Sequence, residues 1–441
     1  MKRRLRTARA PTPAWVGGLV LSALSAHLAG GQSLANRVNA VRDGRVSFTF
    51  AAREGVCGNG RSFISVGSDI HIGSYTMLSD GRTVEPCERG PVRVVLDRAE
   101  GGVIDVNTYV GPLSARGAAG AAEAGTNLGA VRAVDAAQYL LGLAATVEGK
   151  PGRDAILPAA LADSVDVTPQ LLAIARDDTR PRETRRAAIA WLGRQADLSG
   201  SGTRVAAVLV GIARHEGDNS GVRQEALRTL ARLDHGAGIP SLMELARSGT
   251  DSWLTREAMS ALAQSGDPRA RTYLRSVVER ADASDELLAL AIRGLGREFA
   301  TSRDAQLLRQ VYPKLTSERT KRTAIVTVAE IGGAENVRWL LGVARDENER
   351  QDVRRDALQQ ARRAGASTTD LVALYDRTSD PAMKQMLIAV YAESGEKAAV
   401  DKLLSILKSE EERGLRRRAI SYLSRSDDPR VKQALQSIVD Q

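Results

Sequence analysis

Basic side chains recur at one fixed place in a sequence pattern that is repeated eight times. Each copy centres on a small or apolar anchor residue, and successive anchors lie 30 to 38 residues apart. The anchors are Ala188, Ala226, Ala258, Ala291, Ala324, Ala357, Leu387 and Ala419. Cations stand two or three residues before seven of them, at Arg185, Arg186, Arg223, Arg256, Lys321, Arg322, Arg354, Arg355, Lys384, Arg416 and Arg417. Such groups can pair with carboxylates of the same chain or with an acidic ligand.

Two interpretations of these cations remain open. A cation at the start of a helix opposes the helix dipole by about 0.3–1 kcal/mol, so a carboxylate is expected nearby. Acidic residues stand just upstream of the anchor in most copies, among them Asp218, Asp380 and Glu410. The first hypothesis is therefore a ladder of ion pairs between stacked repeats. The second is a cationic stripe for an acidic protein partner, whose binding would weaken strongly with salt.

The chain has two cysteines, Cys57 and Cys87, and no CxxC motif. Thiols of an exported chain tend to pair, so the sequence predicts a structural disulfide between them. This bridge would close a loop of about 30 residues and stabilise the fold by about 3–4 kcal/mol. An exposed nucleophile at Cys57, in the turn VCGNG, is the alternative.

Other chemistry finds little support in the sequence. Histidine is scarce after residue 31, where only His71, His215 and His235 remain, and few histidines with two cysteines make a poor metal set. The motif GxSxG and a phosphate-binding glycine loop are both missing from the sequence. We therefore predict no catalytic residue, no metal and no cofactor.

Residues 1–31 have the three-part layout of a secretory signal. A basic start precedes an uncharged, mostly apolar run from Val16 to Ala29, and small residues follow before Gln32. The expected location is the periplasm or the extracellular space, with an uncleaved membrane anchor as the alternative. No later segment could span a membrane. The formal net charge of +9 falls to +4 without the five basic residues of this segment, so no nucleic-acid partner is expected.

The next 80 residues predict a small antiparallel β module at residues 33–112. Short runs rich in β-formers are separated by turn signals, and they are RVSFTFA (45–51), SFISV (62–66), IHIGSYTML (70–78), VRVVL (92–96) and VIDVNTY (103–109). The segment 93–110 reads as one hairpin. The apolar face of such a sheet needs a cover, for which the first helices are the nearest candidates. Residues 113–130, rich in Ala and Gly, are predicted to form a linker.

From residue 131 to 441 the apolar spacing becomes helical. A period near 32 residues is typical of stacked helical hairpins that cannot bury their apolar faces alone. The predicted fold is mainly α, a solenoid of about eight hairpins. Glycine and Asp-Pro signals, such as Gly332-Gly333 and Asp428-Pro429, mark the breaks between helices.

The copies TRRAAIAWLG (184–193), VRQEALRTLA (222–231), VRRDALQQAR (353–362) and LRRRAISYLS (415–424) resemble HEAT-like repeats. In particular they are similar to the short repeats of bilin-lyase-like proteins. The resemblance covers about residues 165–441 and concerns the repeat, not an activity. It implies that the helices with the V-R-x-x-A pattern line the concave surface.

The function that this organisation favours is a non-catalytic scaffold that binds a partner protein through its concave face. Two alternatives stay open. In one, the β module is a small hydrolase or lyase and the solenoid holds its substrate. In the other, the chain regulates or inhibits an enzyme of the cell envelope. A cavity with several perturbed polar groups in the β module would favour the enzyme.

Overall fold

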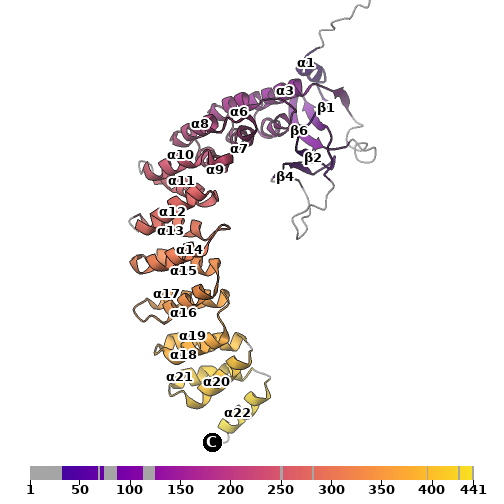
Figure 1. Cartoon of the computed structure of the whole chain (residues 1–441). Coiled ribbons are helices and arrows are strands. Elements are labelled where there is room, and N and C mark those ends of the chain that lie inside the picture. Colours follow the sequence, from indigo (N-terminus) through magenta and orange to yellow (C-terminus); the bar gives the residue numbers. More distant parts are fainter. Residues whose placement is uncertain are drawn as a thin grey trace, which may run out of the picture.

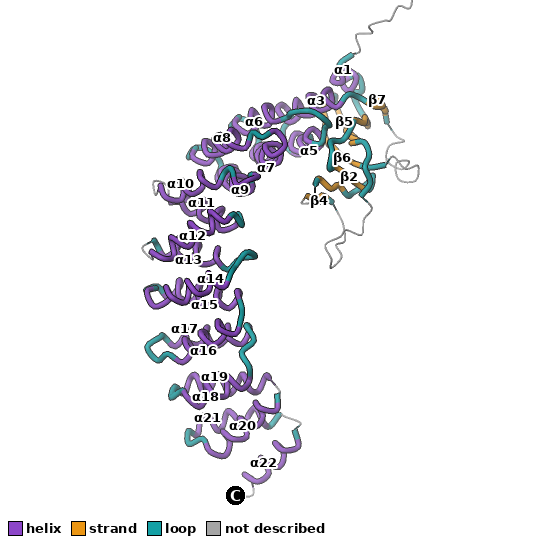
Figure 2. Tube along the Cα trace, viewed as in Figure 1, coloured by secondary structure: helices purple, strands orange, loops and turns teal. Residues whose placement is uncertain are grey.

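The computed structural model describes residues 32–67, 70–73, 87–112, 125–248, 252–280, 283–394, 396–425 and 428–439. The chain forms a hook, with a β module at one end and a long curved array of helices that runs to the C-terminus (Figure 1). Among these described residues, strands occur only beside the first helices (Figure 2). The predicted signal, residues 1–31, lies outside the described residues. Across the described ranges, no helix is both long and apolar enough to cross a membrane.

The larger sheet of the β module has the strand order β6-β5-β1-β7. β1 (Gly44–Phe50), β5 (Val92–Ala99) and β6 (Gly102–Val110) are antiparallel, and β5 and β6 form the hairpin that the sequence predicts. β7 (Thr126–Ala130) pairs with β1 in the parallel direction. The short helix α1 (Leu34–Asn39) precedes the sheet.

A second, three-stranded sheet has the order β2-β3-β4. Its strands β2 (Val56–Gly58), β3 (Ile64–Val66) and β4 (Ile70–Ile72) are antiparallel neighbours. Cys57 of β2 forms a disulfide with Cys87, which ties this small sheet to the chain just before β5. The disulfide therefore joins the two sheets.

The apolar face of the larger sheet packs against α3 (Ala133–Thr146), the first long helix of the chain. Phe48 of β1 and Leu140 of α3 are fully buried. The ring of Tyr139 meets Phe48 edge to face, with 6.3 Å between ring centroids. The helices thus cover the sheet, and α4 (Lys150–Asp154) and α5 (Ile156–Ala160) continue from there.

The predicted linker at 113–130 differs from the structure at its C-terminal end. Residues 113–124 lie outside the described residues, whereas Thr126–Ala130 form the edge strand β7. The sequence TNLGA lacks an alternating pattern, so local preference does not predict a strand. The segment becomes a strand because its backbone pairs with the edge of β1, and strand formation depends strongly on such tertiary contacts. The module is thus antiparallel with one parallel edge strand.

The helical array has two layers, which we call inner and outer helices. The inner helices carry the anchors and are α7 (Arg182–Ser199), α9 (Ser220–Arg232), α11 (Ser252–Gln264), α13 (Asp285–Leu295), α15 (Glu318–Ile331), α17 (Gln351–Arg363), α19 (Pro381–Ser394) and α21 (Arg413–Leu423). The outer helices are α6 (Thr168–Arg176), α8 (Gly202–Arg214), α10 (Ile239–Ser248), α12 (Pro268–Arg280), α14 (Ser302–Val311), α16 (Ala334–Arg345), α18 (Thr368–Arg377) and α20 (Lys397–Ser409), with α22 (Pro429–Val439) at the end.

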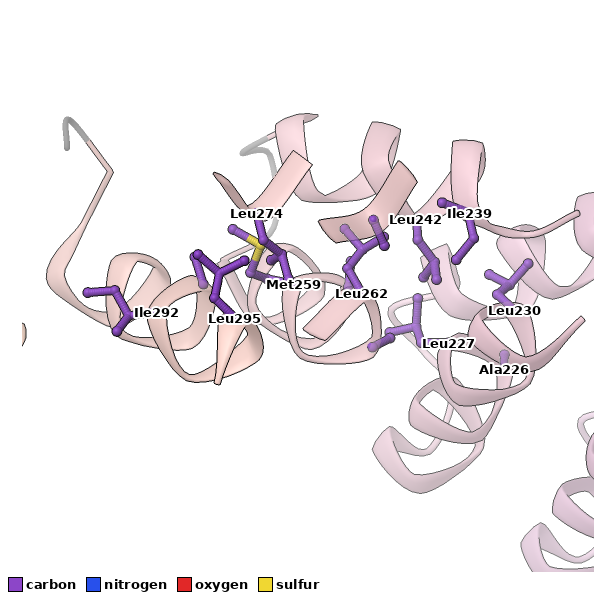
Figure 3. Close-up of a cluster of buried hydrophobic side chains, with 14 of the residues drawn as sticks. Ala226, Leu227, Leu230, Ile239, Leu242, Met259, Leu262, Leu274, Ile292 and Leu295 are labelled. Carbon is purple, nitrogen blue, oxygen red and sulfur yellow. The ribbon is translucent and has the colours of Figure 1, made fainter. Parts of the chain in front are cut away.

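All eight anchors are fully buried. A small alanine lets neighbouring inner helices approach, while larger side chains such as Leu227, Leu242 and Leu262 form a continuous apolar layer from repeat to repeat (Figure 3). Most neighbouring inner helices contact one another more extensively than neighbouring outer helices do, so the array bends toward the inner side. The β module lies on this inner side, opposite α7 and α9 (Figure 1).

Candidate functional site

The side chain three positions before the anchor forms a buried contact between repeats, which we call the buried joint. Arg185 is only 4 % exposed, and its Nε donates to the carbonyl oxygen of Ala175 at the end of α6, at 3.1 Å. Its two terminal nitrogens donate to both carboxylate oxygens of Asp218, at 2.6 and 2.5 Å. Asp218 lies just before the next inner helix, α9. The guanidinium group of Arg185 therefore donates both to a carbonyl group at the end of α6 and to the carboxylate that precedes the next inner helix.

The same geometry recurs further along the array. Arg223 donates from Nε to the carbonyl of Ala213 at 2.8 Å, and Arg354 donates from Nε to that of Ala344 at 3.0 Å. In each case the carbonyl belongs to the last turn of an outer helix, where helical partners are missing and the dipole is negative. Arg354 also pairs with Asp380 of the next repeat at 2.8 Å.

Lysine replaces arginine at this position in two repeats. Lys321 pairs with Glu349 at 2.6 Å, and Lys384 pairs with Glu410 at 3.4 Å. The hydroxyl of Tyr375 also donates to Glu410, at 2.8 Å. Burial opposes ionisation of Glu410, but these hydrogen bonds and the charge of Lys384 outweigh it and lower its pKa. Each lysine thus reaches an acidic residue just before the next inner helix.

The residue two positions before the anchor lies on the open inner face instead. Arg186 and Arg256 are about one-third exposed and lie 3.7 Å from Glu225 and Glu286, which belong to the next inner helices. Arg322 makes closer contacts, and Asp352 of α17 lies 2.9 Å from it. These are screened surface pairs, each worth roughly 0–1 kcal/mol.

The cations at the C-terminal end of this row differ from the others. Arg355 of α17 and Arg417 of α21 are exposed, and Arg416 is half-buried. In the part of the chain that the structure describes, none of the three has an ion-pair partner. The inner face therefore carries uncompensated positive charge near α17 and α21.

The interior of the β module is filled by apolar side chains, and its cavities lie at its border with the helices. One cavity of about 740 Å³ lies between β6, α4 and α7, and we call it the Tyr109 cavity. The buried Arg93 guanidinium stacks over the ring of Tyr109 at 4.6 Å, and Trp191 lines the opposite side. A second cavity of about 780 Å³ lies nearer α9.

No cluster of three or more metal-ligating side chains is found among the described residues. His71 of β4 hydrogen-bonds through Nδ1 to the hydroxyl of Ser65, at 3.2 Å. The cysteine pair is consumed by the disulfide, so Cys57 is no free nucleophile in this structure. The arginines that line the two cavities were missed by sequence reasoning, because they lie outside the repeated pattern and come together only through the contact between module and helices.

Comparison with known sequence families identifies HEAT repeats in this chain. The sequence profile of HEAT repeats matches residues 168–263, 206–285 and 368–441. No curated protein sequence matches the chain. Among solved structures, human deoxyhypusine hydroxylase is 19% identical and similar over 55% of this chain and 92% of its own, with a TM-score of 0.27. One chain of the complex of CpcE and CpcF of phycocyanin lyase from Nostoc sp. PCC7120 is 15% identical, over 61% of this chain and 94% of its own, with a TM-score of 0.28.

A third similar structure is lipovitellin, which is 12% identical over 81% of this chain and 42% of its own, with a TM-score of 0.44. No functional residue is carried over from any of these proteins. The profile match, the paired helices and the eight buried anchors have one common explanation. The chain is a HEAT repeat protein whose matched repeats occupy residues 168–285 and 368–441.

Proposed function

We propose that this protein is a non-catalytic scaffold of the periplasm, cell envelope or extracellular space that binds a partner protein through its inner face. HEAT repeat solenoids expose long curved surfaces suited to large-area recognition. The location is supported by the sequence of residues 1–31 and by the Cys57–Cys87 disulfide, since disulfides persist in oxidising compartments.

One observation carries the choice of the inner face. Along the row two positions before the anchors, Arg186, Arg256 and Arg322 lie close to carboxylates of the next repeat, whereas Arg355 and Arg417 do not, among the described residues. Exposed guanidinium groups without internal partners are available to an acidic surface. Complementary charge of this kind contributes chiefly to the association rate and to specificity.

The test compares an inner-face variant with a control variant on the outer layer of helices. The purified mature protein, its Arg355→Glu/Arg417→Glu variant and an Arg338→Glu variant are cross-linked in a native envelope fraction. Arg338 is exposed on the outer helix α16 and has no ion pair among the described residues. We expect one partner to be recovered with the wild type and with Arg338→Glu, and lost with the inner-face variant at an unchanged melting temperature. Equal recovery with all three proteins would refute the proposal.

The Tyr109 cavity favours a second candidate function, in which the β module binds a small substrate as a hydrolase or lyase. This cavity combines apolar walls with a few polar groups, as ligand sites do. Soaking crystals with a fragment library tests it directly. Fragments that cluster beside Arg93 and Tyr109 would support a small-molecule site, and an empty cavity would leave the scaffold as the remaining candidate.

A further inference from the structure

The second cavity lies where the β module faces the inner helices, and we call it the Arg53 cavity. Arg53 and Val66 line it from the β module, Arg194 of α7 and Leu233 from the array, and Phe299 from the segment after α13. Its volume of about 780 Å³ lies within the range of ligand pockets, which is about 300–1,000 Å³. Two separate parts of the fold thus contribute arginines to a ligand-sized space, Arg53 from the β module and Arg194 and Arg232 from the array.

Both arginines lack an ion-pair partner among the described residues. The Nη1 atom of Arg53 is buried and makes no hydrogen bond. The guanidinium group of Arg194 stacks over the ring of Trp191 at 4.9 Å and donates to the carbonyl of Ala190 at 3.3 Å, without meeting a carboxylate. Both arginines are half-buried, and an uncompensated charge that is partly withdrawn from water is costly.

The electrostatics of the cavity agree with this geometry. Burial lowers the pKa of Arg53, and the nearby positive charge of Arg194 lowers it further. Burial also lowers the pKa of Arg194, to which the charge of Arg232 adds. Arg232 itself pairs with Glu225 at 3.4 Å and is exposed. The negative charge of Glu225 offsets the lowering at Arg194 only in part, and Glu225 makes no ion pair with Arg194 among the described residues.

The remaining walls restrict the kind of anion that fits. Glu54 and Asp234 line the cavity and are exposed, and they repel a ligand with many negative charges. Phe299, which is 56 % exposed, offers an aromatic surface together with the apolar side chains of Val66 and Leu233. A ligand that carries one carboxylate next to an apolar group satisfies all of these surfaces.

We propose that the Arg53 cavity binds an acidic peptide segment of the partner protein. One carboxylate, from an Asp or Glu side chain or a chain terminus, is held between Arg53 and Arg194. A neighbouring apolar side chain packs against Phe299. Because this inference rests on the proposed scaffold function, its test uses the purified chain with peptides and does not depend on recovery of the natural partner.

The experiment selects binders from a phage library of random hexapeptides on the wild-type protein. The selected peptides are then synthesised and titrated against wild type, Arg53→Gln/Arg194→Gln and Arg204→Gln, whose position is exposed on the outer helix α8. We expect enrichment of Asp or Glu beside an apolar residue, a loss of affinity of at least about tenfold in the cavity variant, and no change in Arg204→Gln. Replacement of the acidic residue by its amide should cause the same loss as the cavity variant.

Folding is measured on the same proteins. Because the positive charges of Arg53 and Arg194 repel each other, the cavity variant should unfold at the same temperature as the wild type or at a higher one. Enrichment without acidic residues, no enrichment at all, or equal affinity for the cavity variant would overturn the proposal. Competition by inorganic phosphate but not by acetate would show that the cavity prefers phosphate to a carboxylate, and would also overturn the proposal. If the peptide experiment fails but the partner is still recovered in the envelope experiment, the proposed scaffold function is retained and only the role of the Arg53 cavity is rejected.

Discussion

The guanidinium group of Arg185 donates to both carboxylate oxygens of Asp218, which lies 33 residues later and precedes the next inner helix. Both side chains are almost fully buried, at 5 % and 3 % exposure. The pair thus fixes the position of one repeat on the next at a place that water hardly reaches. Its two groups depend on each other, since either one alone would be an unpaired buried charge.

Replacement of Asp218 by asparagine should therefore be strongly destabilising. The variant leaves the charge of Arg185 without a counterion, and such a loss costs about 3–5 kcal/mol. Chemical denaturation followed by circular dichroism measures it as a lower midpoint. The matched control is Asp352→Asn, which removes an exposed partner of Arg322 and should cost only about 0–1 kcal/mol. Equal losses in the two variants would contradict the role of the buried joint.

The disulfide should stabilise the β module selectively. The protein purified without reductant should have a mass lower by two hydrogen atoms than the reduced protein, and Cys57 and Cys87 should resist alkylation. Reduction should destabilise the module by about 3–4 kcal/mol in the chain-entropy model. Hydrogen exchange should then increase in β2 and β5, with little change in α15 or α17. Ready alkylation of both thiols before reduction would show that the bridge does not form.

Two glycines within helices should respond oppositely to alanine. A Cβ atom on Gly294 of α13 would lie 2.7 Å from the Cβ of Ala263 and 2.9 Å from Leu274, so Gly294→Ala should force the helices apart and cost about 1–3 kcal/mol. A Cβ on Gly342 of α16 meets nothing within 4 Å, so Gly342→Ala should stabilise by about 0.4–1 kcal/mol. Thermal melting of both variants checks the opposite signs.

Stability should fall at alkaline pH because tyrosines are buried. Burial raises the pKa of Tyr139 to about 12, against an ordinary value near 10. The unfolded chain loses this proton first. The contribution of the buried phenol to the free energy of unfolding is therefore complete below pH 10 and is lost as pH rises toward 12. Denaturation midpoints measured from pH 9 to 11.5 should decline less steeply in Tyr139→Phe. The phenol also lacks a hydrogen-bond partner in the described structure, so the variant should not be destabilised at neutral pH.

The array could be predicted from the sequence because its signals are local and repeated. An α-helix turns by about 100° per residue, so the residue three positions before the anchor lies near the anchor's face and the residue two positions before it does not. Arg185 and Arg186 differ in burial for this reason. Carboxylates such as Asp218 and Asp380 stood at regular positions upstream of the anchors, where a pairing hypothesis could include them.

Features that depend on distant contacts could not be predicted in the same way. β7 contains Asn127 and Gly129 and becomes a strand only beside β1. Arg53 and Arg194 are 141 residues apart in the chain and belong to no repeated motif. Their common cavity exists only because the β module packs on the inner side of the first repeats, which no local pattern encodes.

The contact between α17 and α19 is the weakest between successive inner helices in the described ranges. The ion pairs Arg354–Asp380 and Arg362–Glu393, at 2.8 and 2.9 Å, span it where apolar stacking is thin. We therefore expect the solenoid to bend more readily between α17 and α19 than between its other successive inner helices. Bending at this contact would move the segment from α18 to the C-terminus as one unit relative to the longer arm that carries the β module.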